Sequence, residues 1–173
     1  MADSSSENRM FSKKLTAFLA LPLNVMVVIP LLLYFFLGKI PITTANFISA
    51  VLIFIGLGLL VFGSQLLHKT IQLFSSKGKG TLAPWSPTQK LVIEGPYQYS
   101  RNPMITAVVS NLIGIAFVTN HLPILCWALL FFSVNHIYFI LSEEPSLRKK
   151  FGKEYENYFI TTPRWIPKKR SSE

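Results

Sequence analysis

Long uncharged stretches alternate with short polar segments along this chain. The first two, Leu15–Leu37 and Phe47–Leu67, have 23 and 21 residues without a charged side chain. A third stretch of 41 residues, Asn102–Ser142, has no acidic or basic side chain except two histidines, and Thr119–Pro123 supplies a turn in its middle. A helix needs about 20 apolar residues to cross a hydrocarbon layer of about 30 Å. The pattern therefore predicts four membrane-spanning helices, near residues 15–37, 47–67, 103–119 and 122–141.

The composition supports a membrane protein. Hydrophobic residues make up 50% of the chain, charged residues only 14%, and the mean hydropathy is +0.41, whereas soluble domains have about 25% charged residues. Helices are expected because lipid offers no water to exposed backbone groups. We therefore expect an all-α integral membrane protein, a four-helix transmembrane bundle. Its single domain at residues 15–167 lies between a polar tail at 1–14 and a basic tail at 168–173.

The positive charges are distributed unevenly between the two sides of the predicted bundle. Of the 17 Lys and Arg residues, only Lys39 lies in the first connection, and none lies in the third. Because positive residues concentrate on the cytoplasmic side of membrane proteins, we expect both termini and the loop of residues 68–101 to be cytoplasmic. Topology and anionic headgroups explain the net charge of +9, so we expect membrane lipids and no nucleic acid as partners.

The sequence gives no sign of a metal site or a disulfide. Cys126 is the only cysteine and falls inside the fourth predicted span. The histidines at positions 68, 121 and 136 are too scattered to have a metal-ligand spacing.

The segment after the fourth span has the pattern of a further helix. Pro145 suits a first helical turn, and apolar residues recur after it at helical spacing, namely Leu147, Phe151, Tyr155 and Tyr158. Charged residues fill the other faces. We expect an amphipathic helix that lies in the cytoplasmic interface.

Polar residues gather at the cytoplasmic end of the fourth span. In a helix with about 100° per residue, His136 and Glu143 point within about 20° of each other, and Glu144 points about 100° away. Glu143 is therefore expected to face the bundle interior with His136, and Glu144 the preceding loop. Alternatively, both acids are solvated and begin the next helix, where negative charge suits the helix dipole.

Two glycines in the second span, Gly56 and Gly58, also have two interpretations. Small residues in membrane helices permit close packing between helices. The alternative is that backbone exposed at these positions lets a cofactor approach closely.

Several motifs in the second half of the chain occur in a fixed order over residues 89–167. They are Lys90-Leu-Val-Ile-Glu-Gly-Pro-Tyr97, Arg101-Asn-Pro103, Asn135-His-Ile-Tyr-Phe139, Glu143-Glu-Pro-Ser-Leu147, Phe151-Gly-Lys-Glu-Tyr155 and Pro163-Arg-Trp-Ile-Pro167. Together they resemble the isoprenylcysteine carboxyl methyltransferase and phospholipid methyltransferase superfamily. The resemblance implies a multi-span enzyme that transfers a methyl group from S-adenosyl-L-methionine to a lipophilic acceptor.

The resemblance also implies a set of cofactor-binding residues. These are Gln89, Lys90, Leu91, Val92, Gly95, Tyr97, Asn102, Pro103, Glu143 and Glu144, with Gly56 and Gly58 as a shorter match. A carboxylate can bind the donor's ammonium or ribose hydroxyls, and Arg101 can bind its carboxylate bidentately. Tyr97 or Trp85 can lie against the sulfonium as a cation–π partner.

Arg101, Asn102 and His136 are the candidate catalytic residues. Methyl transfer is an in-line displacement, so alignment and exclusion of water are expected to matter most. His136 is the candidate proton acceptor if the nucleophile is an amine. A lone membrane histidine can equally serve as a hydrogen-bond partner of a neighbouring helix.

The chain departs from the family pattern at two places. Many relatives have Arg-His-Pro-x-Tyr where this chain has Arg101-Asn-Pro-Met-Ile105, and no arginine precedes the acid pair in Tyr138-Phe-Ile140. The second departure weakens the prenylcysteine assignment and leaves methyl transfer intact. Two alternatives remain, an NADPH-dependent membrane reductase of the sterol reductase kind and a non-enzymatic membrane scaffold.

Overall fold

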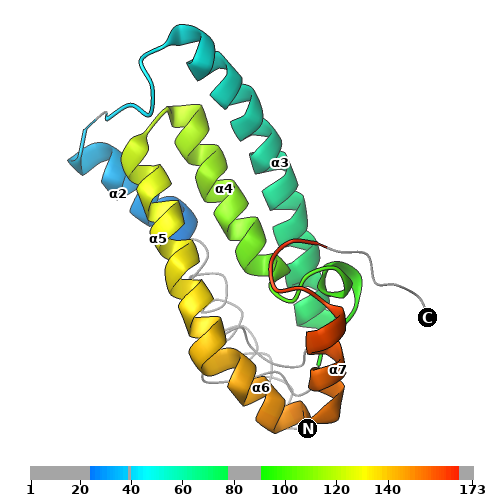
Figure 1. Cartoon of the computed structure of the whole chain (residues 1–173). Helices are drawn as coiled ribbons and strands as arrows, with labels where there is room; N and C mark the ends of the chain where they lie inside the picture. Colours follow the sequence, from blue (N-terminus) through cyan, green and yellow to red (C-terminus); the bar gives the residue numbers. More distant parts are fainter. Residues whose placement is uncertain (1–23, 39, 78–90, 168–173) are drawn as a thin grey trace, which may run out of the picture.

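The computed structural model describes residues 24–38, 40–77 and 91–167, and all elements within them are helical (Figure 1). This confirms the all-α class for the described part of the chain. In chain order the elements are η1 (Asn24–Val28), α2 (Ile29–Phe36), α3 (Asn46–Lys77), η2 (Gly95–Gln98), α4 (Pro103–Thr119), α5 (Leu122–Tyr138), η3 (Phe139–Glu143), α6 (Glu144–Phe151) and α7 (Lys153–Thr161). The segments η1 and η3 are π-helical, and η2 is a 3-10 turn.

The helices match the predicted spans at some ends and not at others. As predicted, α4 begins at Pro103 and ends at Thr119. Helix α3 is longer than predicted because it continues to Lys77. Polar residues there end the apolar stretch without ending the helix, and the buried hydroxyl of Thr70 bonds to the carbonyl of Leu66. The first predicted span begins outside the described residues, so the four-helix bundle stays a prediction.

Within the described residues, two helices are long and apolar enough to cross a membrane. They are Asn46–Leu73 and Leu122–Phe151, which contain 18-residue windows with mean hydropathies of 2.5 and 2.0. Only 11% and 17% of these apolar windows is buried inside the protein, and Phe47 and Phe54 of α3 are exposed. A core helix of a soluble protein would be buried, so these exposed apolar surfaces indicate a membrane protein.

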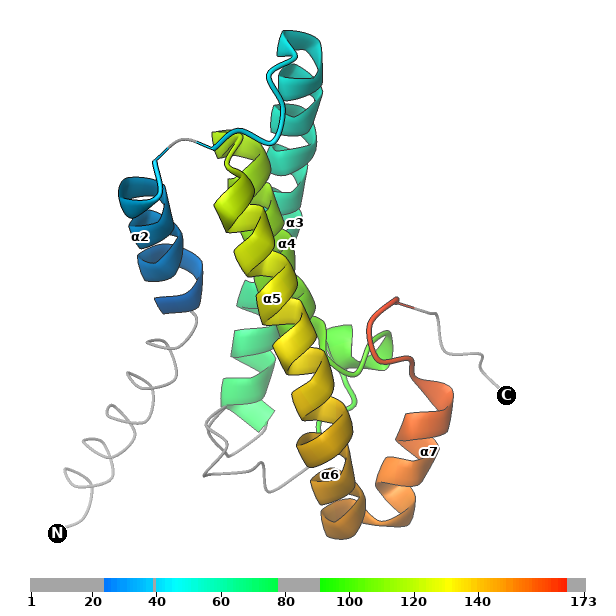
Figure 2. The same ribbon diagram turned by 60° about the vertical axis from the view of Figure 1, so that its left-hand side comes forward.

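The helices α3, α4 and α5 lie side by side, with α4 in the centre (Figure 1, Figure 2). At Gly56, a Cβ atom would lie 2.9 Å from the carbonyl oxygen of Gly114 in α4, and at Gly63 it would lie 2.9 Å from the side chain of Asn111. The two helices therefore approach at positions that only small residues allow. This contact supports the packing interpretation of Gly56, whereas Gly58 faces open space.

The turn between α4 and α5 is tied to the segment that precedes α3. Asn120 ends α4 with a left-handed φ of 48°. Its Oδ1 accepts from the backbone N–H groups of Ile42 and Thr43 at 3.0 and 3.2 Å, and its amide donates to the Thr43 carbonyl at 2.8 Å. The buried ring of His121 places Nε2 at 2.7 Å from the Gly38 carbonyl oxygen. These contacts fix the end of the molecule that lies opposite α6 and α7 (Figure 1).

The segment after α5 is divided into two helices rather than one. The segments η3 and α6 continue α5, and the chain then reverses at Gly152, so that α7 runs back beside α6 (Figure 2). Gly152 has a φ of +52°, a conformation that glycine adopts without steric cost. Tyr155 and Tyr158 of α7 are buried, with 2% and 5% exposure. This aromatic face, predicted to lie against headgroups, packs inside the protein instead.

Candidate functional site

Two segments that are far apart in the sequence meet beside the end of α5. The first, residues 95–103, contains η2 and the start of α4. The second, residues 162–167, follows α7 and is called the C-terminal strap below. The backbone N–H of Arg101 donates to the carbonyl oxygen of Pro163 at 2.9 Å, and the Ser100 hydroxyl donates to the next strap carbonyl at 2.9 Å.

The turn η2 is held between α3 and α7. It begins at Gly95, whose φ is +57° and where a Cβ atom would lie 3.4 Å from Leu73 of α3. On the other side, the buried Tyr158 hydroxyl donates to the carbonyl oxygen of Tyr97 at 2.7 Å. The Gly-Pro-Tyr motif therefore forms a fixed turn whose position depends on α7.

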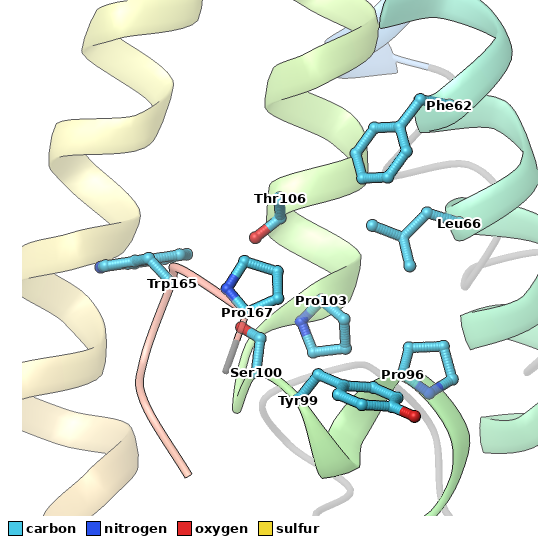
Figure 3. Close-up of a pocket in the computed structure, with 9 residues that line it drawn as sticks. All are labelled: Phe62, Leu66, Pro96, Tyr99, Ser100, Pro103, Thr106, Trp165 and Pro167. Carbon is cyan, nitrogen blue, oxygen red and sulfur yellow. The ribbon is translucent and has the colours of Figure 1, made fainter. Parts of the chain in front are cut away.

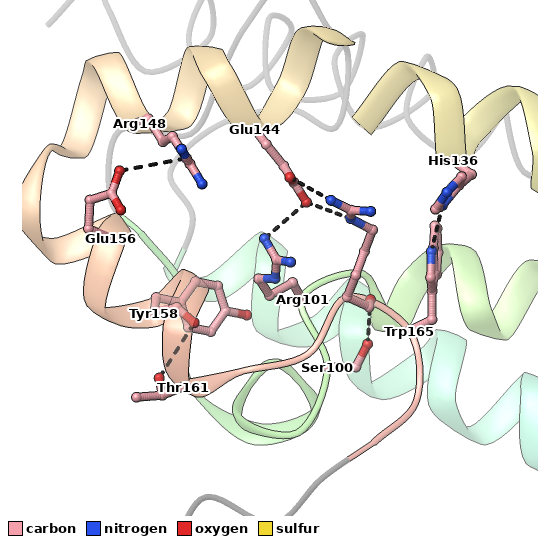
Figure 4. Close-up of polar contacts among 10 residues, drawn as sticks. Ser100, Arg101, His136, Glu144, Arg148, Glu156, Tyr158, Thr161 and Trp165 are labelled. Carbon is pink, nitrogen blue, oxygen red and sulfur yellow. Dashed lines mark hydrogen bonds and ion pairs between the residues drawn. The ribbon is translucent and has the colours of Figure 1, made fainter. Parts of the chain in front are cut away.

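Glu144, the first residue of α6, is buried where these segments meet (Figure 4). Its Oε1 accepts from Arg101 Nη1 at 2.9 Å and from Arg164 Nε at 2.7 Å, and its Oε2 accepts from Arg164 Nη2 at 2.8 Å. The hydrogen bonds from Arg164 raise the pKa of its own guanidinium. A buried carboxylate persists only when it is paired, and two arginines pair this one.

The π-helical segment η3 explains why Glu144 and not Glu143 faces the strap. A π-turn contains one more residue than an α-helical turn, and the N–H of Glu144 bonds to the carbonyl of Phe139, five residues back. The extra residue moves the stripe that starts at His136 from Glu143 to Glu144. The predicted alignment of Glu143 with His136 assumed an unbroken α-helix and is changed by this turn. The predicted contact of Glu144 with the loop of residues 68–101 is confirmed by its bond with Arg101.

Glu143 is half-buried and makes no hydrogen bond or ion pair with another side chain in the described part of the chain. Its charge acts on η2, since burial and then the Glu143 carboxylate raise the pKa of the Tyr97 phenol. That phenol stays protonated at neutral pH. Glu143 is thus the acid of the pair that has no ion-pair partner in the described part of the chain, and its charge acts on Tyr97 of η2.

His136 is bonded to the strap. The indole N–H of Trp165 lies 2.9 Å from His136 Nδ1 (Figure 4). The Trp165 ring also contacts Phe132 and Phe139. An indole nitrogen can only donate, so Nδ1 must be the acceptor, and the proton of a neutral ring lies on Nε2. In this arrangement neither ring nitrogen is free to accept a proton. The role of His136 as a proton acceptor therefore stays a prediction, which its hydrogen bond with the strap does not support.

Arg101 is enclosed on several sides. Its guanidinium carbon lies 4.1 Å from the ring centroid of Phe159, and Arg148 contacts the same ring at 4.2 Å. The Nε atom of Arg101 is buried and has no hydrogen-bond partner among the described residues. Glu144 occupies only Nη1, so the predicted bidentate contact with a donor carboxylate would use the Nε and Nη2 edge of Arg101, and it stays a prediction.

An apolar pocket of about 140 Å³ lies beside the strap (Figure 3). Its walls come from α3, the start of α4, η2 and the strap. They include Phe62, Leu66, Pro103, Thr106, Trp165 and Pro167. Trp165 thus separates this pocket from His136.

A family model for phospholipid methyltransferases matches residues 51–154, more than half of the chain. The chain belongs to the phospholipid methyltransferase family. The match confirms the resemblance found in the motifs, and it runs from α3 into α7. No curated protein matches the chain. Family membership and two helices of membrane length together identify a membrane methyltransferase.

The remaining predicted site residues lie in several parts of the fold. Leu91 and Val92 are half-buried in the extended segment before η2, and Asn102 and Pro103 begin α4, with Pro103 buried. Gln89 and Lys90, as well as Trp85, lie outside the described residues. Gly56 faces α4 and Gly58 faces outward, so neither contacts η2 or the acid pair. Their cofactor roles stay predictions.

Two residues of the strap were not predicted as members of the site. Arg164 binds Glu144, and Trp165 binds His136 and lines the pocket. The sequence contained one signal for Arg164, because a buried acid at the end of a membrane span requires a cation, and the strap motif supplies one. No sequence signal pairs Trp165 with His136, since the reversal at Gly152 brings them together.

Proposed function

We propose that this membrane methyltransferase takes its methyl group from S-adenosylmethionine and transfers it to a lipophilic acceptor at the cytoplasmic surface of the membrane. Membership of the phospholipid methyltransferase family supports the reaction class. The exposed apolar surfaces of α3 and α5 support a membrane-dissolved acceptor. The uneven distribution of Lys and Arg along the chain supports the cytoplasmic side.

The donor assignment rests on one observation, which is that one of the two acids is paired and the other is not. Glu144 is occupied by two arginines, whereas Glu143 is half-buried and unpaired in the described part of the chain. S-adenosylmethionine has a sulfonium and an ammonium group, and a carboxylate binds such cations through charge-assisted contacts. We assign Glu143 to the cationic part of the donor, with the protonated Tyr97 phenol beside it as a hydrogen-bond donor or aromatic partner.

The proposed reaction needs little chemistry from the protein. A lone pair of the acceptor forms a bond to the methyl carbon while the carbon–sulfur bond breaks, and the electron pair stays on sulfur in the neutral thioether product. The protein aligns the two reactants and excludes water. His136 does not remove a proton in this arrangement, because Trp165 occupies its Nδ1. Arg101, Arg164 and Glu144 act as positioning residues that hold α6, η2 and the strap together.

Thermal stability with added cofactor tests the donor. Detergent-solubilised protein is expected to melt at a higher temperature with S-adenosylmethionine and not with NADPH, because a ligand at 100 times its Kd stabilises by about 2.7 kcal/mol. Glu143→Gln is expected to reduce the shift. Glu154→Gln, a matched change of an exposed acid in α7, is expected to keep it. A shift with NADPH alone would overturn the proposal in favour of a reductase.

A labelling experiment tests the reaction itself. Protein incubated with donor that is radiolabelled in its methyl group, together with a total lipid extract, is expected to give a labelled, organic-soluble product. The identity of that product names the acceptor. If label enters no lipid fraction while donor still stabilises the protein, a lipophilic acceptor is the wrong assignment.

A further inference from the structure

We propose that the apolar pocket beside the strap holds one hydrocarbon chain of the methyl acceptor. This inference rests on the proposed function, because it assigns the pocket to the acceptor of that reaction. It adds a place in the structure and a size limit for the chain.

The pocket presents almost no polar surface to a ligand. Its side-chain hydroxyls belong to Ser100, Thr106 and Tyr99, and the first two donate to backbone carbonyls, those of Arg164 at 2.9 Å and Asn102 at 3.1 Å. The remaining walls are proline, phenylalanine, leucine and tryptophan side chains. A site of this kind stabilises hydrocarbon by burying apolar surface, at about 25 cal/mol per Å².

The volume of the pocket limits the occupant to one chain segment. An apolar cavity of about 150 Å³ binds a ligand the size of benzene, and this pocket measures about 140 Å³. Whole drug-sized ligands need about 300–1,000 Å³. The pocket therefore encloses a stretch of one hydrocarbon chain, and it is too small to enclose the whole donor or two acyl chains.

The pocket lies between the lipid-facing surface and the acid pair. Phe62 and Leu66 come from the membrane-length part of α3, and Phe62 is half exposed. On the opposite wall, Trp165 contacts Phe139, four residues before Glu143. Figure 3 shows the side chains from α3 and from the strap on opposite sides of the same space. A chain that enters from lipid beside Phe62 would therefore place the attached reactive group toward the strap and the acids.

Fluorescence quenching of Trp165 tests whether a chain occupies the pocket. The probe is 1-bromodecane, added to detergent-solubilised protein in which Trp85→Phe and Trp127→Phe leave Trp165 as the emitter. A saturable quenching phase is expected above the linear background from partition into micelles, and unbrominated decane is expected to compete for it. Quenching that is linear at all concentrations would overturn the proposal.

Two substitutions at one wall residue make the test specific. Leu66→Phe fills the pocket and is expected to weaken the saturable phase about tenfold or more, since single methylene changes in apolar pockets alter binding by about 10–200-fold. Leu66→Ala enlarges the pocket and is expected to admit a branched bromoalkane that the unchanged pocket rejects. Leu57→Phe, on the exposed opposite face of α3, is the matched control and is expected to change neither result. Equal effects of Leu57→Phe and Leu66→Phe would overturn the proposal.

The methyl-transfer assay connects the pocket to the acceptor. Decane is expected to inhibit labelling of the lipid extract competitively, and Leu66→Phe is expected to raise the apparent KM for the extract with little change in kcat. If decane competes with 1-bromodecane for the saturable quenching of Trp165 but leaves methyl transfer unchanged, the pocket holds a bystander lipid and the proposal is overturned. If no lipid is labelled under any condition, the proposed function is wrong, and the assignment of the pocket to the methyl acceptor is wrong with it. The quenching alone then still shows a hydrocarbon site, so the two failures are distinguishable.

Discussion

Replacing each of the two neighbouring acids by glutamine is expected to have different effects on the stability of the protein. Glu144→Gln removes the charge that pairs Arg101 and Arg164, whereas Glu143→Gln changes a half-buried residue without an ion pair in the described part of the chain. We expect Glu144→Gln to destabilise the protein whether or not donor is present. We expect Glu143→Gln to leave the stability of the ligand-free protein nearly unchanged and to remove stabilisation by the donor.

The magnitude follows from the geometry around Glu144. Its carboxylate accepts three hydrogen bonds of 2.7–2.9 Å from two guanidinium groups, and the side chain of Arg101 is only 8% exposed. Glutamine keeps one oxygen acceptor, but its amide hydrogens then oppose a guanidinium donor. Removing one partner of a buried ion pair costs about 3–5 kcal/mol, because a charge stays buried without compensation. For a protein of this size, this corresponds to a fall in Tm of roughly 6–20 °C.

The assay is thermal unfolding of the two variants, with and without S-adenosylmethionine, in one detergent. Glu154→Gln serves as the control for loss of an acid at the same end of the protein. The reasoning would be refuted if Glu143→Gln lowered Tm as much as Glu144→Gln, since Glu143 would then also belong to the structural network. It would be refuted equally if Glu144→Gln changed Tm by less than the control does.

Three further predictions concern packing and hydrogen bonds. Gly56→Ala places a methyl group 2.9 Å from a carbonyl oxygen of α4 and is expected to lower the stability of the protein by about 1–3 kcal/mol. Gly58→Ala, whose methyl group has no atom within 4 Å, is expected to raise the stability by up to about 1 kcal/mol. Thermal unfolding and donor binding of both variants check this. Asn120→Ala removes three hydrogen bonds and forces alanine into a left-handed conformation, so a loss of roughly 3–5 kcal/mol is expected in thermal unfolding, and a change below about 1 kcal/mol would contradict it. A double-mutant cycle of Trp165→Phe and His136→Ala is expected to give a coupling energy of about 0.5–1.5 kcal/mol from the 2.9 Å hydrogen bond, and additive effects would show that the bond contributes nothing.

The position of α4 could be predicted because strong local signals mark both of its ends. Pro103 supplies a first-turn residue for α4, and Asn120 tolerates the left-handed conformation that ends it. The end of α3 carries no such signal. Its apolar run stops near residue 67, but no proline or glycine follows until Gly78, so the helix continues into polar sequence. Hydropathy therefore predicted the membrane segment and not the helix.

The acid pair shows why the candidate site could be predicted only in part. The motifs pointed to Glu143, Glu144 and Arg101, and the structure does bring Arg101 to Glu144. Which acid faces the strap depends on the π-helical turn, and no residue type in Phe139–Glu143 marks such a turn in the sequence. The ion pair with Arg164 depends on the chain reversal after α6, which is a tertiary contact and leaves no periodic pattern.

The unequal roles of the two acids also bear on release of the product in the proposed reaction. Arg101, Arg164 and Glu144 together have a net positive charge, and Glu143 forms no ion pair with them. S-adenosylmethionine brings one net positive charge, which its transfer of a methyl group removes. Two unit charges about 4 Å apart interact by between about 1 kcal/mol in water and about 4 kcal/mol near a protein surface. In the proposed site, an unpaired Glu143 carboxylate would therefore bind the donor more strongly than the product. An acid that is already paired, as Glu144 is, would distinguish the two far less. A site that held both acids in ion pairs would lose this preference, and one that left both unpaired would lose the contacts that position η2 and the strap.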